Sequence, residues 1–371
     1  MTAGAHRYPR RVLLAVAGLT PQVVTETAWA LARDEPPWIA TEIRVVTTAA
    51  GRERVRLLLL DETEGALRAL AEDLGRPELA RALDDDGIVT VAVGGASIDD
   101  VDSPAANMAF ADAVMAEVRE ICANPDVSLH VSLAGGRKTM GFLAGYALSL
   151  FGRPQDRLSH VLVDPRAEGH PQFFFPPRSP RVLFALGDQR PFRPTPDMVR
   201  LADIPFVRLR EGLPPDLLSG ARSYADTVTA AQASLRPPRL VIDTGARRIV
   251  AGGVVIEPAP MALAFVLWMA ERRRRYGGDD AAVRWDEADT DELAAAYARV
   301  LGHAAPSVQA FRARYRAGLE PERFDEWKAR HNKVVATALG ASSPPYRIVP
   351  VGKRPKTRFR LAIEPDAIEI I

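Results

Sequence analysis

Two short segments of the sequence combine glycines, hydroxyl groups and cations in a pattern that suits phosphate binding. Their candidate ligand-binding residues are Gly18, Leu19, Thr20, Pro21, Gln22, Ser132, Gly135, Gly136, Arg137, Lys138 and Thr139. Glycine lets the backbone approach a ligand closely, and an adjacent arginine and lysine add full positive charges. We therefore expect a ligand that carries phosphate.

The elements around these segments predict an α/β fold with a doubly wound, mostly parallel, Rossmann-like sheet. The predicted strands are 11–17, 43–47, 88–93, 127–133, 160–164 and 181–185, and the predicted helices are 23–33, 53–74, 105–123 and 138–151. In the strand order 3-2-1-4-5 the first and fourth strands are neighbours where the order reverses, and ligands bind at that point in such sheets. Each segment follows one of these two strands and leads into a helix N-terminus, which attracts anions. Both segments should therefore line one crevice.

Other nucleotide-binding patterns are missing. A Walker A loop would need glycine where the second segment has Ser132 and Arg137, and the first segment has Gly18 but no G-x-G-x-x-G fingerprint. The six histidines show no metal-ligand spacing, and the single cysteine, Cys122, excludes a disulfide framework and a cysteine-built zinc site. We expect no cofactor and no metal site.

The composition is that of an ordinary globular chain in a reducing compartment. With 371 residues, of which 47% are hydrophobic, we expect two domains, and a net charge of +1 indicates no class of partner. The apolar runs 12–19 and 258–270 are too short to cross a bilayer, which takes about 20 residues. We expect a cytoplasmic protein without a membrane segment.

Prolines cluster between residues 171 and 215 and predict a domain boundary there. We expect a ligand-binding domain at 1–190, a proline-rich linker at 191–215 and a second domain at 216–371. The second domain has predicted helices at 216–234, 259–274, 287–301, 307–317 and 324–339, and predicted hairpins that pair 240–243 with 248–251 and 346–351 with 357–363. Helices followed by a two-stranded ribbon are typical of a smaller α+β, winged-helix-like domain.

The last part of this second domain is strongly basic. Residues 323–360 hold ten basic residues against Asp325 and Glu326, so this segment has a net charge of +8 and the rest of the chain −7. A basic helix followed by a basic hairpin predicts contact with the phosphate backbone of DNA or RNA. The candidate nucleic-acid-binding residues are Trp327, Arg330, His331, Lys333, Lys353, Arg354, Lys356 and Arg358. The alternative is a solvated basic face, or a ribbon that packs against the acidic first domain.

Residues 18–27 and 132–140 resemble the signature of the CRISPR-associated Rossmann-fold (CARF) family, in particular its ring-nuclease subgroup. Three further stretches match the same pattern: 102–107, which adds Asn107 to the candidate ligand-binding residues, 173–177 and 204–208. The resemblance implies a homodimer that binds a cyclic oligoadenylate, the second messenger of type III CRISPR defence. It also implies that the protein cleaves this messenger without a metal and so switches off the antiviral response.

Under this resemblance, Lys138 and Thr20 are the catalytic candidates. A cyclic tetra-adenylate has four phosphates, and two copies of one crevice in a symmetric dimer suit its symmetry. Cleavage would need a ribose 2′-hydroxyl in line with its own phosphate, and a cation to stabilise the developing charge. Lys138, the single lysine before residue 328, would supply that charge. Thr20 or the backbone of residues 18–22 would position the scissile phosphate, and Arg137 and Gln22 would hold the ring.

The alternative to a ring nuclease is a regulator that binds the ring without cleaving it and whose DNA affinity changes with the ring. Some relatives carry a HEPN ribonuclease domain, in which four to six residues lie between an arginine and a histidine. Here three residues lie between Arg299 and His303, and seven lie between Arg323 and His331. We therefore expect no such ribonuclease.

Overall fold

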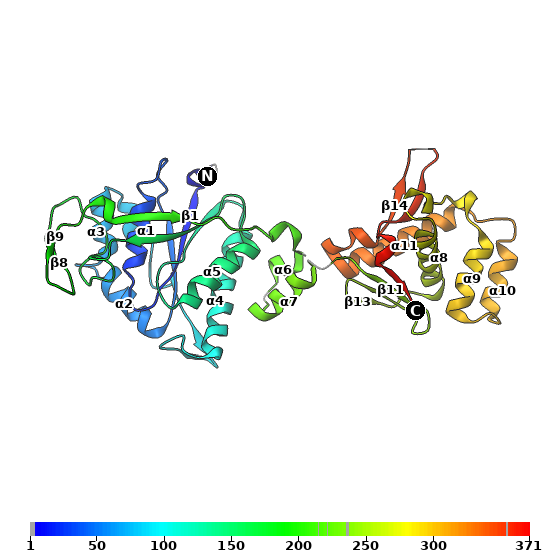
Figure 1. The fold of residues 1–371 in the computed structure, drawn as a ribbon, viewed down its shortest axis with the longest axis horizontal. Coiled ribbons are helices and arrows are strands. Elements are labelled where there is room, and N and C mark those ends of the chain that lie inside the picture. Colours follow the sequence, from blue (N-terminus) through cyan, green and yellow to red (C-terminus); the bar gives the residue numbers. More distant parts are fainter. Residues whose placement is uncertain (1–3, 214, 221, 235–236, 354) are drawn as a thin grey trace. The chain divides into compact units, whose positions relative to one another are not determined.

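The computed structural model describes residues 4–371 except 214, 221, 235–236 and 354. The chain has a mixed α/β fold and divides into two compact units (Figure 1). The first unit comprises Met1–Glu211 and Leu218–Thr227, and the second comprises Gly212–Leu217 and Val228–Ile371. Among the described residues, no helix combines the length and the apolar character that a membrane span requires.

Six strands form the sheet of the first unit, in the order β10-β7-β6-β1-β2-β3. Their bounds are β1 Arg10–Val16, β2 Glu42–Thr47, β3 Ile88–Thr90, β6 Val127–Ser132, β7 Arg157–Val163 and β10 Val199–Asp203. Neighbouring strands are parallel except β10, which pairs antiparallel with β7. The first five predicted strands and their 3-2-1-4-5 order are confirmed, and β1 lies beside β6 where the order reverses.

The sixth predicted strand, 181–185, is wrong as a member of this sheet. Leu183–Phe184 (β8) pairs with Pro191–Phe192 (β9) in a separate hairpin, and β10 forms the sheet edge instead. Strand β10 occupies a run between Pro196 and Pro205 without proline, so every residue keeps the backbone N–H that a sheet needs. The segment 191–215, expected to be a linker, thus supplies an edge strand of the first unit.

Helices cover both faces of this sheet (Figure 1). α1 Gln22–Leu31, α2 Ala49–Leu59 and α3 Ala66–Leu74 share one core, and α4 Pro104–Ala123 packs against α5 Lys138–Phe151. The single helix predicted at 53–74 is wrong, because the chain turns between α2 and α3. There, Oδ1 of Asp61 accepts hydrogen bonds from the backbone N–H groups of Thr63 and Glu64. The end of the third predicted strand also differs, since Ala92–Val93 (β4) forms a hairpin with Ala96–Ser97 (β5).

The second unit contains a four-stranded sheet, in the order β13-β12-β11-β16, and a separate hairpin of β14 and β15. The strands are β11 Leu240–Asp243, β12 Arg248–Ala251, β13 Val254–Ile256, β14 Ile348–Val351, β15 Arg358–Leu361 and β16 Ile368–Ile370. The helices are α8 Pro260–Tyr276, α9 Thr290–Leu301, α10 Pro306–Arg314 and α11 Pro321–Leu339. Both predicted hairpins are confirmed, whereas the sequence pattern indicated neither β13 nor β16.

The helix predicted at 216–234 is two helices, α6 Pro215–Ser219 and α7 Tyr224–Ser234. Ser223 begins the second helix, because its Oγ accepts a hydrogen bond of 3.1 Å from the backbone N–H of Asp226. A serine in this position caps a new helix and does not continue the preceding one.

Trp327 and His331 are wrong as nucleic-acid contacts, because both side chains are buried in the second unit. The Trp327 ring packs against the rings of Phe265, Phe311 and Tyr315. Nε2 of His331 lies 2.9 Å from a backbone carbonyl oxygen, that of residue 346. Buried residues recur every three or four positions along α11, which is the spacing of a core-facing helix stripe.

A buried ion pair joins the ends of β6, α4 and α5 in the first unit. Asp156 is fully buried, and its carboxylate accepts hydrogen bonds from Arg153 Nε (2.9 Å), the backbone N–H of Leu129 (2.9 Å) and Cys122 Sγ (3.5 Å). The side chain of Arg153 is itself 8% exposed. Removing one partner of such a pair leaves a charge buried without compensation.

Replacing Asp156 by alanine should therefore lower the free energy of unfolding of the first unit by about 3 to 5 kcal/mol. Hydrogen exchange of the amides in β1 and β6 would measure this loss. The matched control is Asp188→Ala, which breaks the exposed pair of Asp188 with Arg190 and should cost less than about 1 kcal/mol. Equal effects of the two substitutions would show that the buried pair has no special role.

Candidate functional site

The loops that follow β1 and β6 meet the first turn of α2, which follows β2, at the carboxyl edge of the sheet. A β-carbon on Gly18 would lie 3.1 Å from Cα of Gly136, and one on Gly51 would lie 3.0 Å from the carbonyl oxygen of Gly18. Gly135 and Gly136 have φ angles of +102° and +67°, and a β-carbon on Gly135 would lie 2.7 Å from the carbonyl oxygen of Val16. Larger residues would force the loops apart. The glycines therefore bring the two predicted segments together, and we keep the name crevice for the surface that residues 18–22 and 135–139 form at this edge.

Two helices begin at this crevice without a side-chain cap. α1 follows Pro21 and α5 follows Arg137, and neither side chain has an acceptor for a backbone N–H. By contrast, Thr48 Oγ1 caps α2 and Ser103 Oγ caps α4, each at 3.2 Å. No side-chain cap therefore occupies the backbone N–H groups in the first turns of α1 and α5. These N–H groups and the positive ends of the two helix dipoles can attract an anion.

Lys138 is exposed at the first position of α5. Within the described part of the chain, its ammonium group forms no ion pair and no hydrogen bond. A cation at a helix N-terminus is unfavourable because it meets the positive end of the dipole. The fold therefore holds uncompensated positive charge beside the exposed side chains of Leu19, Thr20 and Thr139.

Arg137, next to Lys138, is held by an acidic residue that the sequence analysis missed. Its Nε and Nη2 atoms donate to the two carboxylate oxygens of Asp100 at 2.8 and 2.5 Å, and this guanidinium lowers the pKa of Asp100. Asp100 lies 37 positions earlier in the chain, so no local pattern could reveal the pair. Asp100 thereby fixes the position of the Arg137 side chain, which is 52% exposed.

Arg54 is a second residue that the sequence analysis missed. It lies on α2 and is exposed, and its Nη1 donates a hydrogen bond of 3.2 Å to the carbonyl oxygen of Leu19. It therefore fixes the first loop and adds another positive charge beside it. Nothing in the sequence distinguishes it from Arg52 and Arg56 on the same helix.

Behind the loops, α1 buries two polar side chains that lie one helical turn apart. Gln22 is 6% exposed, and among the described residues its Oε1 atom has no hydrogen-bond partner. Glu26 is 3% exposed, and its burial, with a smaller contribution from Glu168, raises its pKa to about 8. Glu26 is thus mostly protonated at pH 7, and it places no full negative charge behind the two loops.

Three of the other candidates are less accessible than the loop residues. Ser132 is fully buried, and its Oγ lies 3.1 Å from Oγ1 of Thr27, so it joins β6 to α1 instead of facing the crevice. Asn107 is half-buried in the first turn of α4. Pro21 is buried and fixes the start of α1.

Neither a metal cluster nor a reactive thiol is evident here. In the described ranges, no group of three or more His, Cys, Asp or Glu side chains is placed to hold a metal ion. Cys122 is buried, and its burial raises the pKa of the thiol, so the sulfur stays protonated. The groups that the two loops present are backbone N–H groups, hydroxyls and cations.

Half of the ten basic residues of the segment 323–360 lie in ion pairs, with four acidic residues between them. Five of its residues pair with a nearby acid: Arg323 and Arg330 with Glu326, Lys328 with Asp325, Arg358 with Glu287, and Arg360 with Asp279. Arg354 lies outside the described residues. Lys333, Lys353 and Lys356 are exposed and, in the parts of the chain that are described, form no ion pair. Among the described nucleic-acid-binding candidates, these three lysines carry a positive charge that no neighbouring carboxylate offsets.

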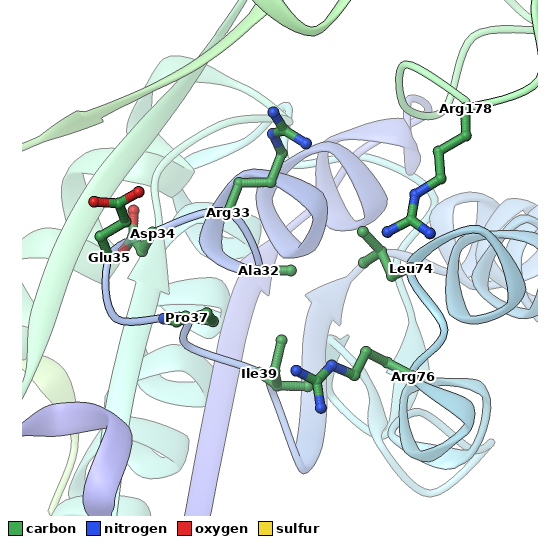
Figure 2. Close-up of a pocket in the computed structure, with 9 residues that line it drawn as sticks. All are labelled: Ala32, Arg33, Asp34, Glu35, Pro37, Ile39, Leu74, Arg76 and Arg178. Carbon is green, nitrogen blue, oxygen red and sulfur yellow. The ribbon is translucent and has the colours of Figure 1, made fainter.

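A separate pocket lies at the other end of α1 (Figure 2). It has a volume of about 490 Å³ and is lined by Ala32, Arg33, Asp34, Glu35, Pro37, Ile39, Leu74, Arg76 and Arg178. Figure 2 shows Arg76 and Arg178 on one side of it and Asp34 and Glu35 on the other. The pocket thus has mixed charge and shares no residue with the crevice.

One family of known proteins matches this chain. The family described as CRISPR-associated protein NE0113 matches residues 20–237, which is more than half of the chain. The matched region begins in the first loop of the crevice and ends before β11, so it contains most of the first unit. A comparison with curated proteins found no match to this chain.

The buried carboxyl of Glu26 predicts a dependence of stability on pH. Its pKa of about 8 lies above the value of about 4.5 expected in the unfolded chain, so the folded state binds the proton more tightly. The stability that this provides is fully present below about pH 4.5 and is lost as the pH rises toward 8. Between pH 6.5 and 8, the free energy of unfolding of the first unit should fall by roughly 1 kcal/mol per pH unit.

Glu26→Gln should remove most of this slope, and Glu168→Gln should leave most of it, because burial is the larger cause of the raised pKa. Pulse proteolysis in urea at each pH would follow the first unit through its fragments. A wild-type slope equal to that of Glu26→Gln would contradict the prediction.

Proposed function

The chain belongs to the CRISPR-associated protein NE0113 family, and from this premise we propose that its first unit is a ring nuclease. In this proposal the crevice binds a cyclic oligoadenylate, in the simplest case cyclic tetra-adenylate, and cleaves it without a metal. The cleavage removes the messenger and so switches off antiviral signalling. The proposal takes its ligand class from the resemblance of residues 18–27 and 132–140 to CARF ring nucleases.

The observation that carries this proposal is the meeting of two uncapped helix N-termini beside an unpaired lysine. The ends of α1 and α5 come together where Gly18 approaches Gly136, and Lys138 stands at the start of α5. Backbone N–H groups, helix dipoles and an ammonium group all favour a phosphate. A nucleotide ring offers several phosphates to such a site.

The reaction needs only groups of the ring itself and of this crevice. The 2′-oxygen of one ribose attacks the adjacent phosphorus, a bond forms between them, and the bond from phosphorus to the 5′-oxygen breaks. The 2′-hydroxyl proton passes to the leaving 5′-oxygen, which leaves a 2′,3′-cyclic phosphate and a 5′-hydroxyl. Lys138 stabilises the charge on the phosphate oxygens in the transition state. Thr20 and the backbone of its loop hold the phosphate in line.

We further propose that two copies of the chain share one ring. Two large apolar side chains near the crevice are strongly exposed, Leu19 at 53% and Phe142 at 66%. Phe142 lies one turn after Lys138 on α5. A second copy related by a two-fold axis would cover these side chains and present a second set of phosphate-binding loops to a symmetric ring.

A second candidate function is a ring-responsive regulator that binds nucleic acid through its second unit. Helices α9, α10 and α11 followed by the β14–β15 hairpin resemble a winged-helix arrangement. The observation that favours this function is the set of exposed, unpaired lysines Lys333, Lys353 and Lys356, since unpaired cations can neutralise backbone phosphates. Under this alternative the ring is bound and not cleaved.

Lys138→Ala should slow ring cleavage by roughly 100-fold, because one source of transition-state charge stabilisation is lost. Binding of the ring should remain detectable, since the helix N-termini are unchanged. Chromatography of linear products after incubation with cyclic tetra-adenylate and EDTA would measure the rate. Lys356→Ala is the matched control and should cleave as the wild type does. A rate unchanged in Lys138→Ala would refute the role of this lysine, and an intact ring with the wild type would favour the regulator.

Replacing both Lys353 and Lys356 by glutamate should weaken the binding of duplex DNA and make the affinity less dependent on salt. Each phosphate contact that is lost should lower the slope of log K against log salt by about 1. The control is the double replacement of Arg190 and Arg200, two exposed residues of the first unit, by glutamate. Fluorescence anisotropy over a series of salt concentrations would compare the variants. Equal slopes for both double variants would tell against a nucleic-acid surface on the hairpin.

A further inference from the structure

Gln22 carries a hydrogen-bond acceptor that the fold buries without a partner. It is the first residue of α1, its side chain is 6% exposed, and Oε1 makes no hydrogen bond among the described residues. Among the described residues, the other buried side-chain nitrogen and oxygen atoms without a hydrogen-bond partner are Arg119 Nε, His130 Nδ1 and Arg272 Nε. None of these lies in the crevice loops, whereas Gln22 follows directly on Leu19, Thr20 and Pro21.

A phosphate cannot satisfy this atom. Phosphate oxygens and Oε1 are all acceptors, so Oε1 needs an N–H or O–H donor. A buried acceptor without a donor carries a desolvation penalty, and a ligand that brings a donor removes this penalty. The part of the ligand that meets Gln22 is therefore different from the part that meets the helix N-termini and Lys138.

A side-chain amide has a donor and an acceptor side by side in one plane. Adenine presents the complementary pair, because its 6-amino group donates and its N7 accepts, and glutamine forms two hydrogen bonds with this edge. On this same edge guanine and hypoxanthine present acceptors at both O6 and N7, so a base that meets Gln22 with this edge leaves Oε1 unpaired.

We propose that the amide of Gln22 reads the edge of an adenine base and thereby sets the base selectivity of the crevice. This inference rests on the proposed function, since it takes the ligand to be a nucleotide ring. It assigns to Gln22 a task separate from that of Lys138. Lys138 acts on the phosphate, and Gln22 distinguishes adenine from other purines.

The test compares two rings that differ in the base edge. Titration calorimetry would measure the binding of 2′-deoxy cyclic tetra-adenylate and 2′-deoxy cyclic tetra-inosinate, neither of which can be cleaved by 2′-attack. The wild type should bind the adenine ring at least roughly tenfold more tightly than the inosine ring. Gln22→Met keeps the length of the side chain and removes both polar atoms, so it should bring this ratio close to one.

The matched control is Gln155→Met. Gln155 donates to the carbonyl oxygen of Val127 at the first residue of β6, which is the opposite edge of the sheet from the crevice. This variant should keep the wild-type ratio. A 7-deaza-adenine ring offers a second measurement that needs no variant, since it lacks the N7 acceptor. It should bind the wild type more weakly than the adenine ring.

The outcomes separate this inference from the proposed function. If the wild type binds both rings equally, or if Gln22→Met keeps the ratio, Gln22 does not read adenine and ring binding still stands. If the wild type binds neither ring, the proposed function fails, and the role of Gln22 fails with it. A ratio that is lost in Gln22→Met and kept in Gln155→Met supports the assignment.

Discussion

The close approach of two backbones, at Gly18 and Gly136, is the constraint on which the rest of the crevice depends. A β-carbon at position 18 would lie 3.1 Å from Cα of Gly136, so no larger residue fits there without moving the second loop. The approach follows from β1 and β6 being parallel neighbours whose chains leave the sheet at the same edge. It brings the starts of α1 and α5 together, and both helices lack a side-chain cap. One contact between glycines therefore turns two separate loops into a single surface at which two helices begin.

The charges around this contact are arranged so that one cation stays available. Arg137 is held by Asp100, and Arg54 bonds to the carbonyl oxygen of Leu19. Lys138 forms no such bond within the described residues, although the helix dipole disfavours a cation at its position. The carboxyl of Glu26, whose pKa burial raises to about 8, is mostly neutral behind the loops at pH 7. This arrangement costs stability and is understandable if the ligand brings the compensating negative charge.

In the second unit, ion pairs with nearby acidic residues reduce the number of basic side chains that are available to a partner. The segment 323–360 has a net charge of +8 in sequence, yet five of its cations lie in ion pairs, three of them along α11 and two with Glu287 and Asp279. Trp327 and His331 pack into the core of that unit. What remains for a partner, among the described residues, is a small set of lysines on α11 and on the hairpin. The family match ends at residue 237, so it gives no information on this part.

The sequence alone determined the central strands, their order and the two loops, because long apolar runs and glycines next to cations are local signals. It did not reveal β10, since a short run among prolines forms a strand only when β7 offers it an edge. Nor did it show the turn at Asp61, or that the core-facing stripe of α11 includes Trp327 and His331. The pairing of Arg137 with Asp100, the burial of Glu26 and the unpaired Oε1 of Gln22 were decided by tertiary structure alone. Each depends on groups that are distant in the chain and adjacent in space, and the energy of a charge or an amide is set by those neighbours.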